Sequence, residues 1–241
     1  MANSYFEFKK FTVRQELCAM KVGTDGVLLG AWASLAGCRD VLDVGTGTGL
    51  IALMLAQRGE SENRTLRIDA LDIDTGAVEQ ATLNIQASPY SDRIRTECQS
   101  FTSYAQRTGK RYDLIVSNPP YFHNSLKCPD IQRNTARHTD TLTLEDLLEG
   151  CRCLLVPAGR IALILPADRK EELVRLSEPM GLNITRQTDV SSVEGKPPKR
   201  LLAELSFGAP GRTHDSLALE TALHRYTPAF TALIKDFYLK I

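Results

Sequence analysis

The residues Val41–Leu50 read Val-Leu-Asp-Val-Gly-Thr-Gly-Thr-Gly-Leu, and this stretch decides the fold. It opens with a short, mostly apolar run, which is typical of a buried strand. Gly45, Gly47 and Gly49 follow in alternation, and residues 51–56 are apolar and free of turn residues, as in a helix. Glycine has no Cβ and tolerates positive φ, so a ligand can approach the backbone of such a turn closely. The stretch therefore predicts a strand, a ligand-facing glycine turn and the N-terminus of a helix.

The spacing of the three glycines indicates the kind of ligand. A dinucleotide-binding turn has the pattern G-x-G-x-x-G, whereas here the third glycine comes one residue early. Asp43, two residues before the first glycine, would repel a pyrophosphate and attract a positively charged amino acid group. The pattern resembles the cofactor loop of class I S-adenosylmethionine (AdoMet) methyltransferases. That resemblance implies that Asp43, Gly45, Gly47 and Gly49 bind AdoMet; a NAD site and a turn without a ligand are the alternatives.

Composition excludes several classes of protein. The chain has 241 residues, enough for one domain with a full core, and carries 29 basic and 29 acidic side chains, so nucleic-acid binding would need a local basic patch. No apolar run approaches the ~18 residues of a membrane helix, and the first ten residues lack the apolar core of a signal peptide. We therefore expect a cytoplasmic protein. The six cysteines and four histidines show no metal-ligand spacing, so we expect no metal. Nothing indicates an obligatory protein partner.

Seven apolar or alternating segments predict strands, most of them separated by helical segments. The predicted strands are 41–44, 66–74, 94–98, 112–116, 161–165, 182–190 and 200–207. This alternation predicts a Rossmann-like α/β fold with a doubly wound, seven-stranded sheet. The last two strands are joined by a hairpin-length loop without a helix. They are expected to form an antiparallel pair at the C-terminal edge.

The whole chain, residues 1–241, is expected to be one methyltransferase domain. Residues 1–35 would form an N-terminal arm and a helix, 36–210 the catalytic core, and 211–241 the C-terminal helix. Residues 208–215 are interpreted as a linker. Thr227 as N-cap and Pro228 at the first helical position mark the start of the last helix.

Acidic residues end the second predicted strand. The carboxylate of Asp72 could accept both ribose hydroxyls of an adenosine-containing cofactor, with Ile73 beside it. Asp74 fits better as the N-cap of the helix that follows. We therefore assign Asp72 and Ile73 to the cofactor site.

Two further segments are assigned to the cofactor. Ser100 or Gln99, at the exit of the third strand, would hold the cofactor adenine at a position where the methyltransferase pattern often has an acid. Phe101 would pack on that ring or belong to the core. The glycine-containing loop before the first strand could close over the cofactor, although helix capping would also explain its polar residues. Its assigned residues are Lys21, Gly23, Thr24 and Asp25.

A second motif, Asn118-Pro119-Pro120-Tyr121, follows the fourth predicted strand. An exocyclic amine is a poor nucleophile, and the Asn118 side-chain oxygen and the Pro119 carbonyl could accept its two hydrogens. Two prolines stiffen that geometry, and Tyr121 could stack on the base. Because strands one and four are neighbours in a doubly wound sheet, this motif and the glycine turn should share one crevice. A rigid turn without catalytic function is the alternative.

The two motifs together resemble the N6-adenine and N5-glutamine branches of class I methyltransferases. Residues 6–32 and 134–138 are similar to the bacterial tRNA adenine-N6 methyltransferases, and this similarity covers nearly the whole chain. It implies a tRNA partner and an anticodon-loop adenosine as substrate. A protein-glutamine N5-methyltransferase is the alternative, although only about forty residues precede the first strand, too few for its usual helical recognition domain. A DNA adenine methyltransferase and a non-enzymatic AdoMet-sensing or RNA-binding module also stay open.

Local clusters of basic residues could contact RNA phosphates if they line one face of the protein. Each cluster alone is more often a solvated surface. The candidates are Lys9, Lys10, Arg133, Arg137, Lys196, Lys199 and Arg200.

Overall fold

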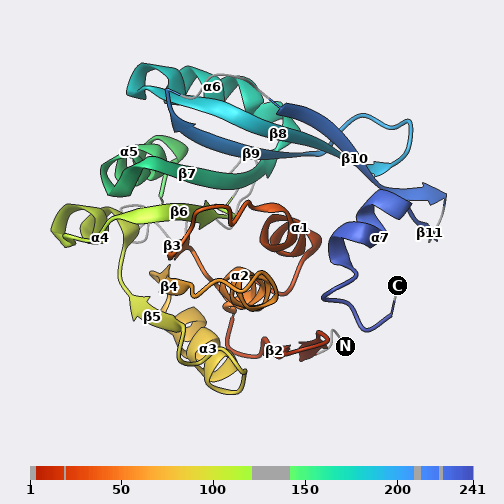
Figure 1. The fold of residues 1–241 in the computed structure, drawn as a ribbon, viewed down its shortest axis with the longest axis horizontal. Coiled ribbons are helices and arrows are strands. Elements are labelled where there is room, and N and C mark those ends of the chain that lie inside the picture. The colour runs from red at the N-terminus through yellow and green to blue at the C-terminus, as the bar shows by residue number, and fades with distance from the viewer. Residues whose placement is uncertain (1–3, 19, 121–141, 209–212, 223–224, 241) are drawn as a thin grey trace, which may run out of the picture.

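A computed structural model describes residues 4–18, 20–120, 142–208, 213–222 and 225–240. Its centre is a nine-stranded sheet in the order β11-β10-β8-β9-β7-β6-β3-β4-β5, and β1 and β2 form a separate hairpin (Figure 1). The strands are β1 (Tyr5–Glu7), β2 (Thr12–Arg14), β3 (Asp40–Val44), β4 (Arg67–Asp72), β5 (Ile94–Cys98), β6 (Tyr112–Ser117), β7 (Leu155–Pro166), β8 (Leu182–Val193), β9 (Arg200–Phe207), β10 (Thr213–Ala222) and β11 (Arg225–Tyr226).

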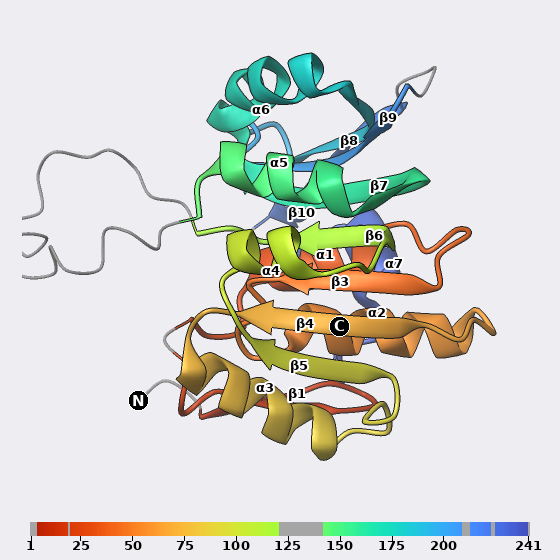
Figure 2. The same ribbon diagram turned by 90° about the vertical axis from the view of Figure 1, so that its left-hand side faces the viewer.

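Helices cover both faces of the sheet (Figure 2). The helices are α1 (Thr24–Trp32), α2 (Leu50–Ser61), α3 (Thr75–Gln86), α4 (Phe101–Arg107), α5 (Leu144–Leu154), α6 (Lys170–Ser177) and α7 (Pro228–Ile234). One apolar cluster joins α1, α2, α3 and α7 to one face, and a second joins α4, α5 and α6 to the other. Coverage on both faces explains why the central strands are continuous apolar runs rather than alternating ones.

The predicted α/β fold is confirmed, and two strands must be added to the predicted seven. Residues 213–215 of the segment interpreted as a linker belong to β10, which pairs in parallel with β8. The range 211–241, expected to be a C-terminal helix, therefore contains β10 and β11 as well as α7. Most residues of β10, which lies next to the edge strand β11, are exposed. Its sequence therefore lacks the apolar pattern that marks a buried strand. The antiparallel pair β8–β9 is present, but β10 and β11 lie beyond it, so the pair is not the edge of the sheet.

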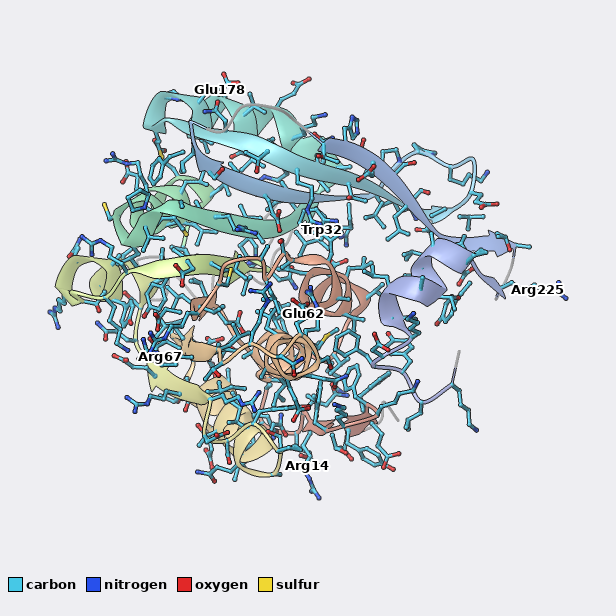
Figure 3. The ribbon with its side chains drawn as sticks, viewed as in Figure 1. Arg14, Trp32, Glu62, Arg67, Glu178 and Arg225 are labelled. Carbon is cyan, nitrogen blue, oxygen red and sulfur yellow. The ribbon has the colours of Figure 1, made fainter. Side chains whose placement is uncertain are left out.

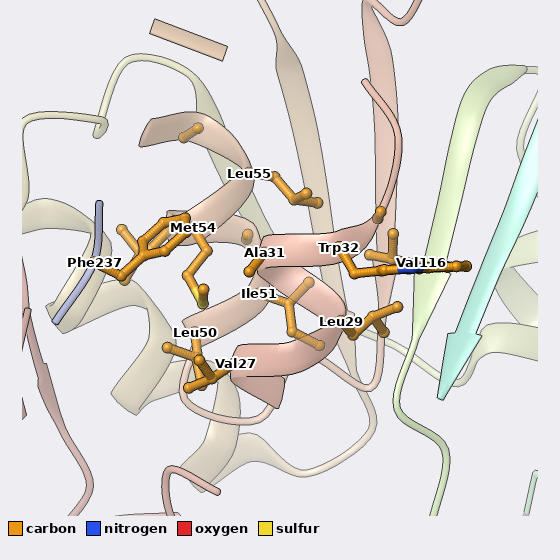
Figure 4. Packing of buried hydrophobic residues seen from close by; sticks show 14 of the residues in the cluster. Val27, Leu29, Ala31, Trp32, Leu50, Ile51, Met54, Leu55, Val116 and Phe237 are labelled. Carbon is orange, nitrogen blue, oxygen red and sulfur yellow. The ribbon is translucent and has the colours of Figure 1, made fainter. Parts of the chain in front are cut away.

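Helix α1 is buried on all sides. Its residues from Gly26 to Trp32 are all buried, which agrees with apolar residues around its whole circumference. Figure 4 shows its side chains packed against Leu50, Ile51 and Met54 of α2. At its C-terminal end, Trp32, labelled in Figure 3, donates a 2.9 Å hydrogen bond to the hydroxyl of Thr188 in β8. Helix α1 is therefore held against both α2 and β8.

The N-terminal hairpin packs against the C-terminal segment. Phe8 forms a β-bridge with Tyr238, and the Lys9 ammonium donates a 2.6 Å hydrogen bond to the carbonyl of Lys235. Lys10 forms a 2.9 Å ion pair with Glu60 of α2. These contacts hold the two ends of the described chain together.

The last helix begins where the sequence predicts. The hydroxyl of Thr227 accepts a 3.1 Å hydrogen bond from the amide of Phe230, and Pro228 is the first helical residue. None of the described helices is long and apolar enough to cross a membrane.

Candidate active site

The glycine turn and the proline motif lie at the same end of neighbouring strands. β3 pairs in parallel with β6, and Val44 is directly opposite Ser117 in the register. A cavity of about 790 Å³ opens beyond these strand ends, and its border includes Gly45, Asn118 and Pro120. This volume lies in the range of small-molecule sites. The prediction that the two motifs share one crevice is confirmed.

All three glycines of the turn have positive φ. The angles are 73° at Gly45, 56° at Gly47 and 81° at Gly49, a region that other residues rarely adopt. A Cβ at Gly49 would lie 3.3 Å from the Cβ of Ala81 in α3, so glycine also permits close packing of that helix. The amides of Gly45 and Thr46 donate to the Leu71 carbonyl at 2.9 and 2.8 Å. The turn is therefore held to the end of β4.

Asp43 lies beneath the turn and is not among the described residues that border the cavity. Its side chain is fully buried, and it accepts a 2.7 Å hydrogen bond from the hydroxyl of Thr46. Burial away from water raises the pKa of Asp43 to about 7. Thr46 itself borders the cavity. Direct contact of Asp43 with a ligand therefore stays a prediction, and in the structure its carboxylate is bonded to Thr46 at the cavity border.

Asp72 connects the second strand to the glycine turn. One of its carboxylate oxygens accepts a 2.8 Å hydrogen bond from the Gly47 amide, and the other accepts a 3.0 Å bond from the Asp74 amide. Asp72 borders the cavity together with the half-exposed Ile73. Asp74 caps α3 through a 2.8 Å bond from the Ala77 amide, as predicted.

The residues at the exit of β5 also reach the cavity. Ser100 caps α4 by accepting a hydrogen bond of 3.2 Å from the Ser103 amide, and the Gln99 amide donates to the Asp72 carbonyl at 3.0 Å. Phe101 borders the cavity but is 5% exposed and packs in the core between α4 and α5. Phe101 was predicted either to pack on the cofactor adenine or to belong to the core, and most of its surface is buried in the core.

The loop before α1 forms another wall. Lys21, Gly23, Thr24 and Asp25 all border the cavity. Gly23 is the N-cap residue of α1, and no side chain in the described part of the chain caps this helix. Thr24 and Asp25 therefore lie in the first helical turn, and the capping interpretation is wrong for both. Backbone N–H groups of an uncapped first turn are available to an anionic group.

The basic candidates fall into four groups. Lys199 and Arg200 border the cavity, and Arg200 pairs with Asp25 at 2.8 Å. Lys196 is exposed on the β8–β9 hairpin. Lys9 and Lys10 bind the protein itself in the contacts given above, and neither borders the cavity among the described residues. Tyr121, Arg133 and Arg137 lie outside the described residues.

Sequence reasoning missed several residues of the cavity wall. Cys18, Asp146, Ser191 and Ser192 border it and come from three separate places in the chain. Only Asp146 has a local signal, because it forms a capping pair with Thr143 at the start of α5. Among the described residues, no group of three or more His, Cys, Asp or Glu side chains could hold a metal ion.

Comparison with known proteins agrees with this geometry. Residues 26–174 match the model of the methyltransferase small domain family, and the chain belongs to that family. It is 55% identical over 242 aligned residues to the tRNA1(Val) (adenine(37)-N6)-methyltransferase of Parabacteroides distasonis, covering all of both chains. It is 48% identical to the enzyme of the same name from Phocaeicola vulgatus, again over the full length of both.

A solved structure supports the fold. A predicted O-methyltransferase of Agrobacterium tumefaciens aligns with a TM-score of 0.69 at 19% identity, covering 88% of this chain and 96% of that one. At this identity the likeness concerns the fold alone.

Proposed function

We propose that this protein transfers the methyl group of AdoMet to the exocyclic N6 of an adenosine in tRNA, at position 37 of valine tRNA. The observation that carries the proposal is the shared cavity of Asn118 and the glycine turn. The substrate is taken from the relatives, which are named for this reaction and align over their full length. A tRNA-modifying enzyme would meet its substrate in the cytoplasm.

The residues at the cavity fit AdoMet. The Asp72 carboxylate is fixed by two backbone amides, so it is oriented to accept ribose hydroxyls. The uncapped start of α1 and the ammonium of Lys21 offer donors and positive charge to the carboxylate of the methionine part. Gln99 and Ser100 would bind the adenine edge, and Ile73 would cover its face. When bound, AdoMet supplies an electrophilic methyl group on a positively charged sulfur.

The proline motif supplies the chemistry at the amine. The amide oxygen of Asn118 and the carbonyl of Pro119 would accept the two N6 hydrogens, which directs the nitrogen lone pair toward the cofactor half of the cavity. Pro119 and Pro120 restrict the backbone, so little reorganisation is needed in the transition state. No strong general base is needed, because the amine becomes acidic once it is alkylated. Tyr121 would stack on the base.

RNA would reach the cavity past the β8–β9 hairpin. Lys199 borders the cavity and Lys196 lies exposed on the same hairpin, so both could contact phosphates. Arg133 and Arg137 belong to the segment after the proline motif and would add to this surface. Lys9 and Lys10 are less suited, because both are bound to other parts of the protein.

One experiment tests the proposal directly. The purified protein is incubated with AdoMet and an unmodified valine tRNA transcript, and the nucleosides are analysed by mass spectrometry. We expect N6-methyladenosine, which disappears when adenosine 37 is replaced by guanosine. A release factor serves as the second substrate: methylation of its glutamine, with none on tRNA, would instead establish the protein-glutamine activity.

A further inference from the structure

The ion pair between Asp25 and Arg200 joins two distant parts of the chain at the cavity. Arg200 Nε lies 2.8 Å from Asp25 Oδ2, and both residues border the cavity. Asp25 belongs to the first turn of α1, and Arg200 is the first residue of β9. The two side chains are only 22% and 35% exposed, so water screens their attraction only in part.

The two partners differ in how firmly their backbones are held. Arg200 lies within the sheet, opposite Pro166 of β7 and Val190 of β8. The preceding residue, Lys199, donates from its amide to the Val190 carbonyl at 2.8 Å and accepts from the Ala167 amide at 3.1 Å. By contrast, α1 starts at Thr24, and none of the described side chains caps its N-terminus. The strand therefore provides the rigid anchor, and the start of α1 is the part that is restrained.

The position of Asp25 gives this restraint a consequence for the cofactor. Asp25 lies two residues after Gly23, in the first turn of α1, and Gly23, Thr24 and Asp25 all border the cavity. The backbone N–H groups of this turn are the donors proposed above for the cofactor carboxylate. Those groups bind an anion only if the first turn keeps its orientation. An unpaired carboxylate at that point would also repel the carboxylate of the methionine part. Arg200 meets both requirements, since it holds the turn and balances the charge of Asp25.

We infer that Arg200 is a positioning residue for the cofactor, acting through Asp25, and that Lys199 beside it contacts RNA. This inference rests on the proposed function for the identity of the cofactor. It reassigns Arg200 from the RNA-binding set predicted from sequence. Arg200 would therefore affect AdoMet affinity, whereas Lys199 would affect the salt dependence of tRNA binding, and the two effects can be measured separately.

The test compares Arg200→Gln, Asp25→Asn, their double variant and Lys199→Gln. AdoMet affinity is measured by calorimetry without RNA, and valine tRNA affinity is measured at several salt concentrations. We expect each single variant of the pair to weaken AdoMet binding about fivefold, and the double variant to be no weaker than either single one. In these three variants, tRNA affinity should change with salt concentration as it does in the parent. Lys199→Gln should keep AdoMet affinity and reduce the slope of log K against log salt by about one.

The control is Arg169→Gln, which removes the 2.6 Å ion pair with Glu172 outside the cavity border. It should change neither property. The inference is overturned if Arg200→Gln reduces the salt slope and leaves AdoMet affinity intact, or if the effects of Arg200→Gln and Asp25→Asn on AdoMet simply add. Since AdoMet binding is measured without RNA, this comparison still decides the inference if tRNA is not the substrate.

Discussion

The hydroxyl of Ser117 donates a 2.8 Å hydrogen bond to the carbonyl oxygen of Val44, joining the ends of β6 and β3. Each residue is the last of its strand, and the proline motif and the glycine turn begin at the next residue. Both are almost completely buried. This bond therefore adds to the pairing of β3 with β6 at the point where the two halves of the proposed active site begin.

Replacing Ser117 by alanine should disturb both stability and catalysis. The buried Val44 carbonyl would lose this partner, so the free energy of unfolding should fall by about 1 kcal/mol. The rate of methyl transfer should fall as well, because Asn118 would be less firmly held relative to the turn. Urea unfolding and single-turnover kinetics measure the two effects. A variant as stable and as active as the parent would show that the bond has no role in holding the two strand ends together.

Asn118→Ala should separate binding from chemistry. The side chain borders the cavity at the proline motif, where it would accept a hydrogen of the target amine. We expect AdoMet affinity to stay near that of the parent and the rate of methyl transfer to fall by about 10²–10³-fold. Calorimetry with AdoMet and single-turnover methylation of tRNA check the two parts. Full activity in this variant would contradict the proposed role of Asn118 in holding the target amine.

Asp72→Asn should weaken cofactor binding through two routes. The amide keeps one acceptor oxygen, so one of the bonds to Gly47 and Asp74 is lost together with the negative charge. We expect AdoMet affinity to fall about tenfold. Asp74→Ala is the matched control: it removes the cap of α3 and should lower stability by about 1 kcal/mol with a smaller effect on AdoMet. Equal loss of AdoMet affinity in both variants would contradict a specific role for Asp72.

Asp43 predicts a pH dependence of stability with a defined sign. Burial raises its pKa to about 7 in the folded protein, above its ordinary value of 3.8. Between these values the folded state holds a proton that the unfolded state has released, so this contribution to stability is full below about pH 4 and is lost as pH rises to about 7. Asp43→Asn removes this titration and keeps an acceptor for Thr46. Unfolding free energies should therefore favour the variant progressively over the parent from pH 4 to 7, and a constant difference would disprove the assignment.

Much of this architecture follows from local sequence. The Asp43–Gly49 pattern requires positive φ at three glycines and therefore predicts the turn without knowledge of the rest of the chain. Thr227 and Asp74 cap their helices through hydrogen bonds to an amide three residues on, which is a local property. The alternation of strands and helices likewise fixes the parallel centre of the sheet. These features depend on backbone sterics and on neighbours within one turn.

Other features of the structure cannot be predicted from local sequence. Strand β10 is mostly exposed and carries no apolar pattern, and its first residues, 213–215, fall in the segment interpreted as a linker. The ion pair of Asp25 with Arg200 spans 175 residues, and no local rule connects its partners. Lys9 and Lys10 resembled an RNA-binding arm, but their partners are Lys235 and Glu60.

By itself, the sequence of this protein determined the glycine turn, the proline motif and their place at the carboxyl ends of two strands. Local backbone geometry dictates each of these. Only the tertiary structure decided that Asp43 lies under the turn rather than in the cavity and that Arg200 meets Asp25. Both depend on how distant segments pack, and packing sets burial and charge neighbours in three dimensions.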